Sequence, residues 1–152
     1  MKDPAEIKKL AYERLEEAEI LHRNNKHDGA FYLSGYSVEL MLKAKVCERI
    51  SVPNLFDEDD KVLNATSGIS EIRRFLKTHN LHILLIFSGL REKFENDKIS
   101  NTHLLKANSL LFSNWNETSR YKPCGFMDAG DVTDLLSLLK DPDGLLLWIE
   151  KN

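Results

Sequence analysis

Residues 30–50 read AFYLSGYSVELMLKAKVCERI, and this stretch decides the fold. At helical spacing it is apolar around most of its circumference, with lines of residues such as Leu33, Leu40 and Ala44 repeating at short helical intervals. A helix that is apolar almost all round is buried, so the stretch predicts the central helix of a bundle. It has about 21 residues and a charged end, which makes it too short and too polar to span a membrane.

One polar stripe interrupts this apolar surface. It consists of Tyr32, Tyr36, Glu39 and Lys43, which follow one another at intervals of four, three and four residues. Glu39 precedes Lys43 by one helical turn, the favourable order for an ion pair, which contributes only about 0.2–0.5 kcal/mol if exposed. Two interpretations stay open: the stripe contacts a ligand, or it is a buried polar network that ties the helices together.

The composition indicates one ordinary globular domain over residues 1–152, because 42% of the residues are apolar and 30% are charged. Glycine and proline are scarce, at 7 and 4 residues, which favours helices. The formal net charge is −3, so contact with nucleic acid would require a local basic patch. The only two cysteines, Cys47 and Cys124, are expected to be reduced thiols.

The remaining periodic segments all predict helices, and no segment alternates with the period of a strand. Residues 51–67 predict an exposed connection with one short helical turn near Lys61, and residues 116–130 predict an irregular stretch. The fold class is therefore all-α, an antiparallel bundle of five to seven helices. The helices other than the central one are predicted at residues 4–23, 69–77, 81–94 and 99–115, from Asp131 past Leu139, and from Asp141-Pro142 through Ile149.

Several function classes are excluded or weakened by absent motifs. The phosphate-binding loop, the dinucleotide-binding glycine pattern and the nucleophile elbow do not occur. His79 and His82 could share a helical face, but cysteine or carboxylate partners at metal-binding spacing are missing, so no metal or cofactor is expected. The first residues, MKDPAEIKKL, lack the apolar core of a signal peptide, and we expect a cytoplasmic protein without membrane association.

Arg74 and His79 form an R-x4-H spacing that could be catalytic. A histidine can transfer protons near neutral pH, and an arginine can stabilise the negative charge that develops during RNA cleavage. The same spacing often arises by chance in a basic helical sequence, and the alternative interpretation is a basic surface patch.

The chain resembles the HEPN (higher eukaryotes and prokaryotes nucleotide-binding) domain family. The central helix carries the pattern Tyr-x3-Tyr-x2-Glu-x3-Lys-Ala at residues 32–44, and Thr78-His79-Asn80-Leu81 heads a later helix. Trp115 followed by Arg120-Tyr121 is similar to a third segment of many members. These motifs occur in the family's order and cover the chain from residue 8 to about residue 150.

The resemblance implies an antiparallel helical bundle, commonly a homodimer, that is either a metal-independent RNase or a non-catalytic module. The RNases use an R-x4-6-H motif late in the bundle, where Arg120 is the natural candidate for the arginine, but no histidine follows at that spacing. Arg74 and His79 have the spacing, yet His79 already matches the helix-start segment.

The leading hypothesis is therefore a non-catalytic module that binds a nucleotide, RNA or a nucleotidyltransferase-type protein, possibly within a toxin–antitoxin or defence system. One alternative is an RNase that uses Arg74 with His79, or Arg120 with a distant histidine such as His103. A further alternative is a purely structural or interaction protein. The ligand-binding residues expected under the leading hypothesis are Tyr36, Glu39, Lys43, Arg120 and Tyr121.

Overall fold

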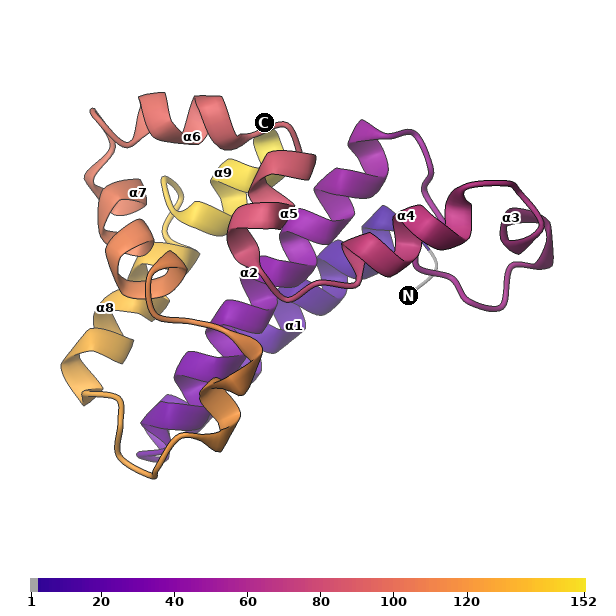
Figure 1. Cartoon of the computed structure of the whole chain (residues 1–152). Coiled ribbons are helices and arrows are strands. Elements are labelled where there is room, and N and C mark those ends of the chain that lie inside the picture. The colour runs from indigo at the N-terminus through magenta and orange to yellow at the C-terminus, as the bar shows by residue number, and fades with distance from the viewer. Residues whose placement is uncertain (1–2) are drawn as a thin grey trace.

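The structure is a computed structural model that describes residues 3–152, and two long antiparallel helices form its spine (Figure 1). Helix α1 covers Pro4–Arg23 and helix α2 covers His27–Arg49. The Asp3 carboxylate accepts a hydrogen bond of 2.9 Å from the Glu6 amide, which caps α1. Only residues 24–26 connect the two helices.

Helix α2 is the centre of the molecule, as its apolar circumference predicts. Fourteen of its residues are buried. The Ser37 hydroxyl donates a hydrogen bond of 2.8 Å to the Ala11 carbonyl, so α1 and α2 approach each other closely. The shorter helices α5 (Leu81–Phe87), α8 (Ala129–Lys140) and α9 (Leu145–Lys151) pack against α2 and share its hydrophobic core (Figure 1).

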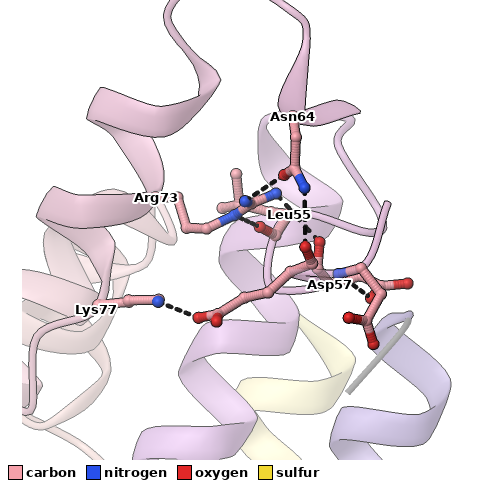
Figure 2. Close-up of polar contacts among 7 residues, drawn as sticks. Leu55, Asp57, Asn64, Arg73 and Lys77 are labelled. Atoms are coloured by element: carbon pink, nitrogen blue, oxygen red, sulfur yellow. Dashed lines mark hydrogen bonds and ion pairs between the residues drawn. The ribbon is translucent and has the colours of Figure 1, made fainter. Parts of the chain in front are cut away.

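An arm that carries α3 (Lys61–Asn64) and α4 (Ile69–Leu76) extends from the end of α2 (Figure 1). Arg73 fastens α4 to the connection before it, donating from Nε to the Leu55 carbonyl at 2.6 Å and from its terminal nitrogens to Asn64 and Asp57 (Figure 2). The connection was predicted to be exposed, which is wrong for Leu55 and Phe56. Both are buried, because they cover the end of the core.

The single helix predicted over residues 81–94 is divided into α5 (Leu81–Phe87) and α6 (Arg91–Asp97). Gly89 adopts a φ of 74° between them, a left-handed conformation that ends the first helix. The helix predicted from residue 99 begins later, as α7 (Thr102–Ala107), and continues as a π-helical turn at Asn108–Phe112. Asn80 and Asn101 cap α5 and α7.

The last two helices are α8 (Ala129–Lys140) and α9 (Leu145–Lys151). Helix α8 begins slightly before the predicted Asp131, because Asp128 accepts hydrogen bonds from the first amides. Asp141-Pro142 does not open α9, which begins after Gly144 instead. No strand occurs in residues 3–152, so the all-α class is confirmed. None of the helices in this range has the length and apolar character needed to cross a membrane.

Candidate functional site

The polar stripe of α2 is divided between two clusters. Glu39, Lys43 and His79 form the first, which we call the Glu39 cluster. Tyr32, Arg120 and Tyr121 form the second, which we call the Arg120 cluster. Tyr32 and Lys43 are eleven residues apart, so the two ends of the stripe are separated by about 16 Å along the helix axis.

The Glu39 cluster is built on a buried carboxylate. Glu39 is fully buried, its Oε1 accepts a hydrogen bond of 2.6 Å from Lys43 Nζ, and its Oε2 lies 2.9 Å from His79 Nδ1. Both carboxylate oxygens are therefore occupied. A buried charge is tolerated only when it is paired and hydrogen-bonded, and Glu39 meets that condition.

Lys43 is enclosed as well, with 7% of its surface exposed. Its ammonium lies 5.7 Å from the centre of the Phe56 ring, which covers it from the connection after α2. Every buried side-chain nitrogen and oxygen among the described residues has a hydrogen-bond partner. This half of the stripe consequently has the properties of a buried structural network rather than of an open binding surface.

His79 is the accessible member of the Glu39 cluster. It lies between α4 and α5, and 45% of its side chain is exposed although Nδ1 is held by Glu39. Arg74 and His79 have the R-x4-H spacing in the sequence. Among the hydrogen bonds and ion pairs of the described residues, none joins these two side chains. His82, which could share a helical face with His79, packs against Phe112 instead. The centroids of the two rings are 5.4 Å apart.

The Arg120 cluster is exposed. Arg120 and Tyr121 end a 3-10 helix, η2 (Glu117–Tyr121), and the Arg120 guanidinium lies 4.8 Å from the centre of the Tyr121 ring. Tyr121 is 75% exposed. The Tyr121 phenol and, to a smaller extent, the Tyr32 phenol raise the pKa of Arg120, so Tyr32 on α2 belongs to the same cluster. A cation and an accessible aromatic ring thus lie side by side, next to the partly buried Tyr32.

Two contacts with α2 hold the segment that carries Arg120. Trp115 Nε1 donates a hydrogen bond of 3.0 Å to the Tyr32 carbonyl, and the indole lies directly over Gly35. The Asp28 carboxylate accepts hydrogen bonds from the Gly125 amide at 2.6 Å and the Met127 amide at 2.9 Å. Sequence reasoning missed both contacts. The available signal was Gly35, because a glycine inside a well-formed helix often marks a close approach.

Tyr36 lies between the two clusters and is half-buried. Burial is the main cause that raises the pKa of Tyr36, followed by the charge of Glu39 and the neighbouring Tyr32. Its phenol therefore stays protonated at neutral pH and can donate or accept a hydrogen bond. The structure brings Glu39 and Lys43 together, and Arg120 and Tyr121 together, while Tyr36 lies between Tyr32 and Glu39 along α2.

Comparison with protein-family models, with curated proteins and with solved structures returned no match. Among the described residues, no group of three or more histidine, cysteine or acidic side chains could hold a metal ion.

Proposed function

We propose that the chain is a non-catalytic, HEPN-like module that binds single-stranded RNA or a nucleotide through the Arg120 cluster and Tyr36. The observation that carries this proposal is the exposed Arg120 guanidinium stacked at 4.8 Å on the Tyr121 ring. A guanidinium binds phosphate, and an exposed aromatic ring offers a face on which a base can stack. This combination is typical of surfaces that bind single-stranded nucleic acid.

The local charge favours an anionic ligand despite the net charge of −3. Arg120 and Lys122 follow each other closely in the exposed segment after Trp115. Lys122 Nζ lies 4.9 Å from the centre of the Phe126 ring, so a second cation–aromatic pair adjoins the first. With a net negative charge, contact with nucleic acid requires a local basic patch, and these two cations on one short segment provide it.

In this proposal Glu39 and Lys43 do not touch the ligand, because both are buried. Glu39 holds His79 against α2, and Lys43 donates a hydrogen bond to the other oxygen of the Glu39 carboxylate. In this proposal Glu39 and Lys43 have a structural role only. The residues that contact the ligand are Tyr36, Arg120 and Tyr121.

Fluorescence anisotropy with a labelled single-stranded RNA of about 12 nucleotides tests the proposal, a length within the usual range of site sizes. Tyr121→Ala should weaken binding by about 5- to 100-fold, the loss expected for one stacked base. Arg120→Ala should also weaken binding and reduce the slope of affinity against salt by about one unit. Unlabelled ATP as a competitor distinguishes a nucleotide site from an RNA site.

Lys151→Ala is the matched control, because it removes an exposed charge at the far end of the chain. It should leave the anisotropy titration nearly unchanged. If the Arg120→Ala and Tyr121→Ala variants bind RNA and ATP as the unaltered protein does, the Arg120 cluster is not the ligand site and the proposal is wrong.

One contact favours RNA cleavage as a second candidate function. A carboxylate that holds one ring nitrogen of a histidine fixes the tautomer and directs the other nitrogen toward a substrate. Glu39 holds His79 Nδ1 in this way, and His79 is accessible. In this reading His79 transfers protons at a phosphodiester, and Arg74 stabilises the charge on the phosphoryl group.

Incubation of the purified protein with RNA in the presence of a chelator tests this second candidate. His79→Gln and Arg74→Ala should each abolish metal-independent cleavage, and Glu39→Gln should slow it. Equal cleavage by the unaltered protein and by the Arg74→Ala/His79→Gln variant would show a contaminating nuclease and exclude the candidate.

The resemblance adds two further parts to the proposal, a homodimer and a nucleotidyltransferase-type protein partner. We also propose a cytoplasmic location. The location is supported by two free cysteines, Cys47 and Cys124, since disulfides are typical of oxidising compartments. Co-purification of the chain with a co-expressed nucleotidyltransferase encoded beside it tests the partner.

A further inference from the structure

A hollow of about 410 Å³ lies between α5 and α6, two helices that are joined by the short connection at residues 88–90 (Figure 1). Ligand sites in proteins commonly have volumes of about 300–1,000 Å³, so a small molecule fits in this space. The lining includes no residue of the Glu39 cluster or the Arg120 cluster. It consists of His82, Leu85 and Ile86 from α5, and of Arg91 and Glu95 from α6.

Helix α5 supplies the apolar part of the hollow. Leu85 is buried, whereas 48% of Ile86 is exposed although it is a large apolar side chain. Most of the surface that a small ligand meets in a protein pocket is apolar, with a few polar groups that fix its orientation. Ile86 and Leu85 therefore offer a contact for the apolar part of a ligand.

Two basic side chains line the hollow without a polar partner in the protein. Among the described residues, no hydrogen bond or ion pair involves the side chain of Arg91 or of His82. The His82 ring packs against the Phe112 ring on one side, which leaves its nitrogens available. A guanidinium presents parallel N–H donors that match two oxygens of a phosphate or a carboxylate. The polar groups that are free to bind a ligand are thus mainly donors.

Glu95 is the one acidic residue of the lining, and a neighbouring cation already compensates its charge. Its Oε2 lies 2.8 Å from Lys98 Nζ, and only 16% of the Lys98 side chain is exposed. The hydrogen bond from Lys98 is the main cause that lowers the pKa of Glu95, and the charges of Lys98, Arg91 and His82 lower it further. Three basic groups therefore surround one carboxylate, and the hollow has an excess of positive charge.

We propose that the hollow between α5 and α6 binds a small molecule that carries an oxyanion, either a phosphate or a carboxylate, on an apolar body. Arg91 binds two oxygens of the anion, His82 donates a further hydrogen bond, and the apolar body packs on Leu85 and Ile86. A cationic ligand is disfavoured, because Arg91 would repel it and Lys98 already occupies the only carboxylate. This site goes beyond the proposed function, since it does not require RNA or a nucleotide at the Arg120 cluster.

Titration of the isotope-labelled protein with phenyl phosphate, followed by NMR, tests the site. Phenyl phosphate joins an oxyanion to an apolar ring, and the amide signals of residues 82–95 should shift in a saturable manner. We expect a dissociation constant on the order of millimolar, because the probe is small and the hollow is open to solvent. A parallel titration with benzoate distinguishes a carboxylate from a phosphate. Phenol and inorganic phosphate each supply only one half of the ligand, and both should bind more weakly.

Three variants test the roles of the charged residues. Arg91→Gln should weaken the binding of phenyl phosphate by about 10- to 100-fold, the loss expected for hydrogen bonds to a charged group. Glu95→Gln should strengthen it by about 2- to 5-fold, because the one negative charge of the lining is removed and Lys98 is released. Arg23→Gln is the matched control, since Arg23 is an exposed arginine at the end of α1 and does not line the hollow. Circular dichroism establishes that all three variants fold.

Each outcome decides for or against the site. Saturable shifts at residues 82–95 that Arg91→Gln weakens and Arg23→Gln does not would support it. The absence of such shifts with both anions, equal binding of phenol and phenyl phosphate, or an unchanged affinity in Arg91→Gln would overturn it. Shifts confined to residues 115–127 would assign the anion to the Arg120 cluster and overturn it as well. A failure of RNA binding in the anisotropy experiment bears only on the proposed function.

Discussion

Gly35 of α2 and Trp115 are in direct contact, with no room for a side chain between them. A Cβ at Gly35 would lie 2.3 Å from atoms of the Trp115 indole. The same indole donates a hydrogen bond of 3.0 Å from Nε1 to the Tyr32 carbonyl. This contact places the segment that carries Arg120 and Tyr121 on the central helix, so the geometry of the candidate site depends on the absence of one methyl group.

Gly35→Ala should therefore destabilise the protein although alanine favours a helix. The helix preference contributes about 1 kcal/mol in the opposite direction, and overpacking typically costs about 1–3 kcal/mol. We expect a net loss of free energy of unfolding and weaker RNA binding, measured by urea denaturation and anisotropy. Gly29→Ala is the control, since its Cβ would lie 3.2 Å from one Leu21 methyl group. An unchanged or higher stability of Gly35→Ala would contradict the Trp115 contact.

Asp28→Ala should loosen the segment after η2 while the helical core stays folded. The Asp28 carboxylate accepts two amide hydrogen bonds, from Gly125 and Met127, and a hydrogen bond to a charged group contributes about 1.5–3 kcal/mol. Hydrogen exchange of residues 122–127 should accelerate, and RNA binding should weaken. Exchange in α2 should change little. Equal protection of residues 122–127 in the variant and the unaltered protein would disprove the role of Asp28.

Lys43→Met should be strongly destabilising, because it leaves the Glu39 carboxylate buried without its ammonium partner. Removal of one partner of a buried ion pair costs about 3–5 kcal/mol. The double variant Glu39→Gln/Lys43→Met should cost less than the sum of the two single changes. Chemical denaturation of all four proteins measures this coupling.

The matched control is the exposed pair of Lys9 and Glu13, which are 3.9 Å apart with side chains 80% and 48% exposed. Lys9→Met should cost less than about 1 kcal/mol. If Lys43→Met costs no more than Lys9→Met, then Glu39 and Lys43 are not held as the buried pair described above.

The two cysteines should differ in reactivity. Cys47 is buried, and burial raises the pKa of the Cys47 thiol to about 11, whereas Cys124 is exposed. Because the thiolate is the reactive form, a maleimide at pH 8 should label Cys124 rapidly and Cys47 only after denaturation, as mass spectrometry would detect. The Cys124→Ser variant should show no rapid labelling. Two adducts forming at similar rates in the folded protein would rule out the burial of Cys47.

The same burial gives a pH dependence. The ordinary pKa of the thiol is 9.0 and the folded value is about 11, so the folded state favours the neutral form. The stabilisation from Cys47 is fully present below pH 9 and is lost as the pH rises through 11. The free energy of unfolding of the unaltered protein should fall more over this interval than that of Cys47→Ala.

The amino-acid sequence by itself determined the fold class and the spine of the molecule. Helix α2 was predictable because apolar residues cover most of its circumference, and α1 because Asp3 and Pro4 supply a cap and a first residue. These are local properties, since a hydrophobic period and a cap depend only on neighbours in the chain. The spacing of Tyr36, Glu39 and Lys43 likewise follows from the helical period, which places the three residues along one side of α2.

Tertiary structure alone decided what each polar residue contacts. Glu39 meets His79, which is forty residues away, because the arm returns α5 to α2. The segment that carries Arg120 lies beside Tyr32 because Trp115 packs on Gly35 and donates a hydrogen bond to the Tyr32 carbonyl. The division of residues 81–94 at Gly89 and the burial of Leu55 and Phe56 were likewise settled by packing. Contacts between distant segments depend on how the helices fill the core, and no periodicity within one segment contains that information.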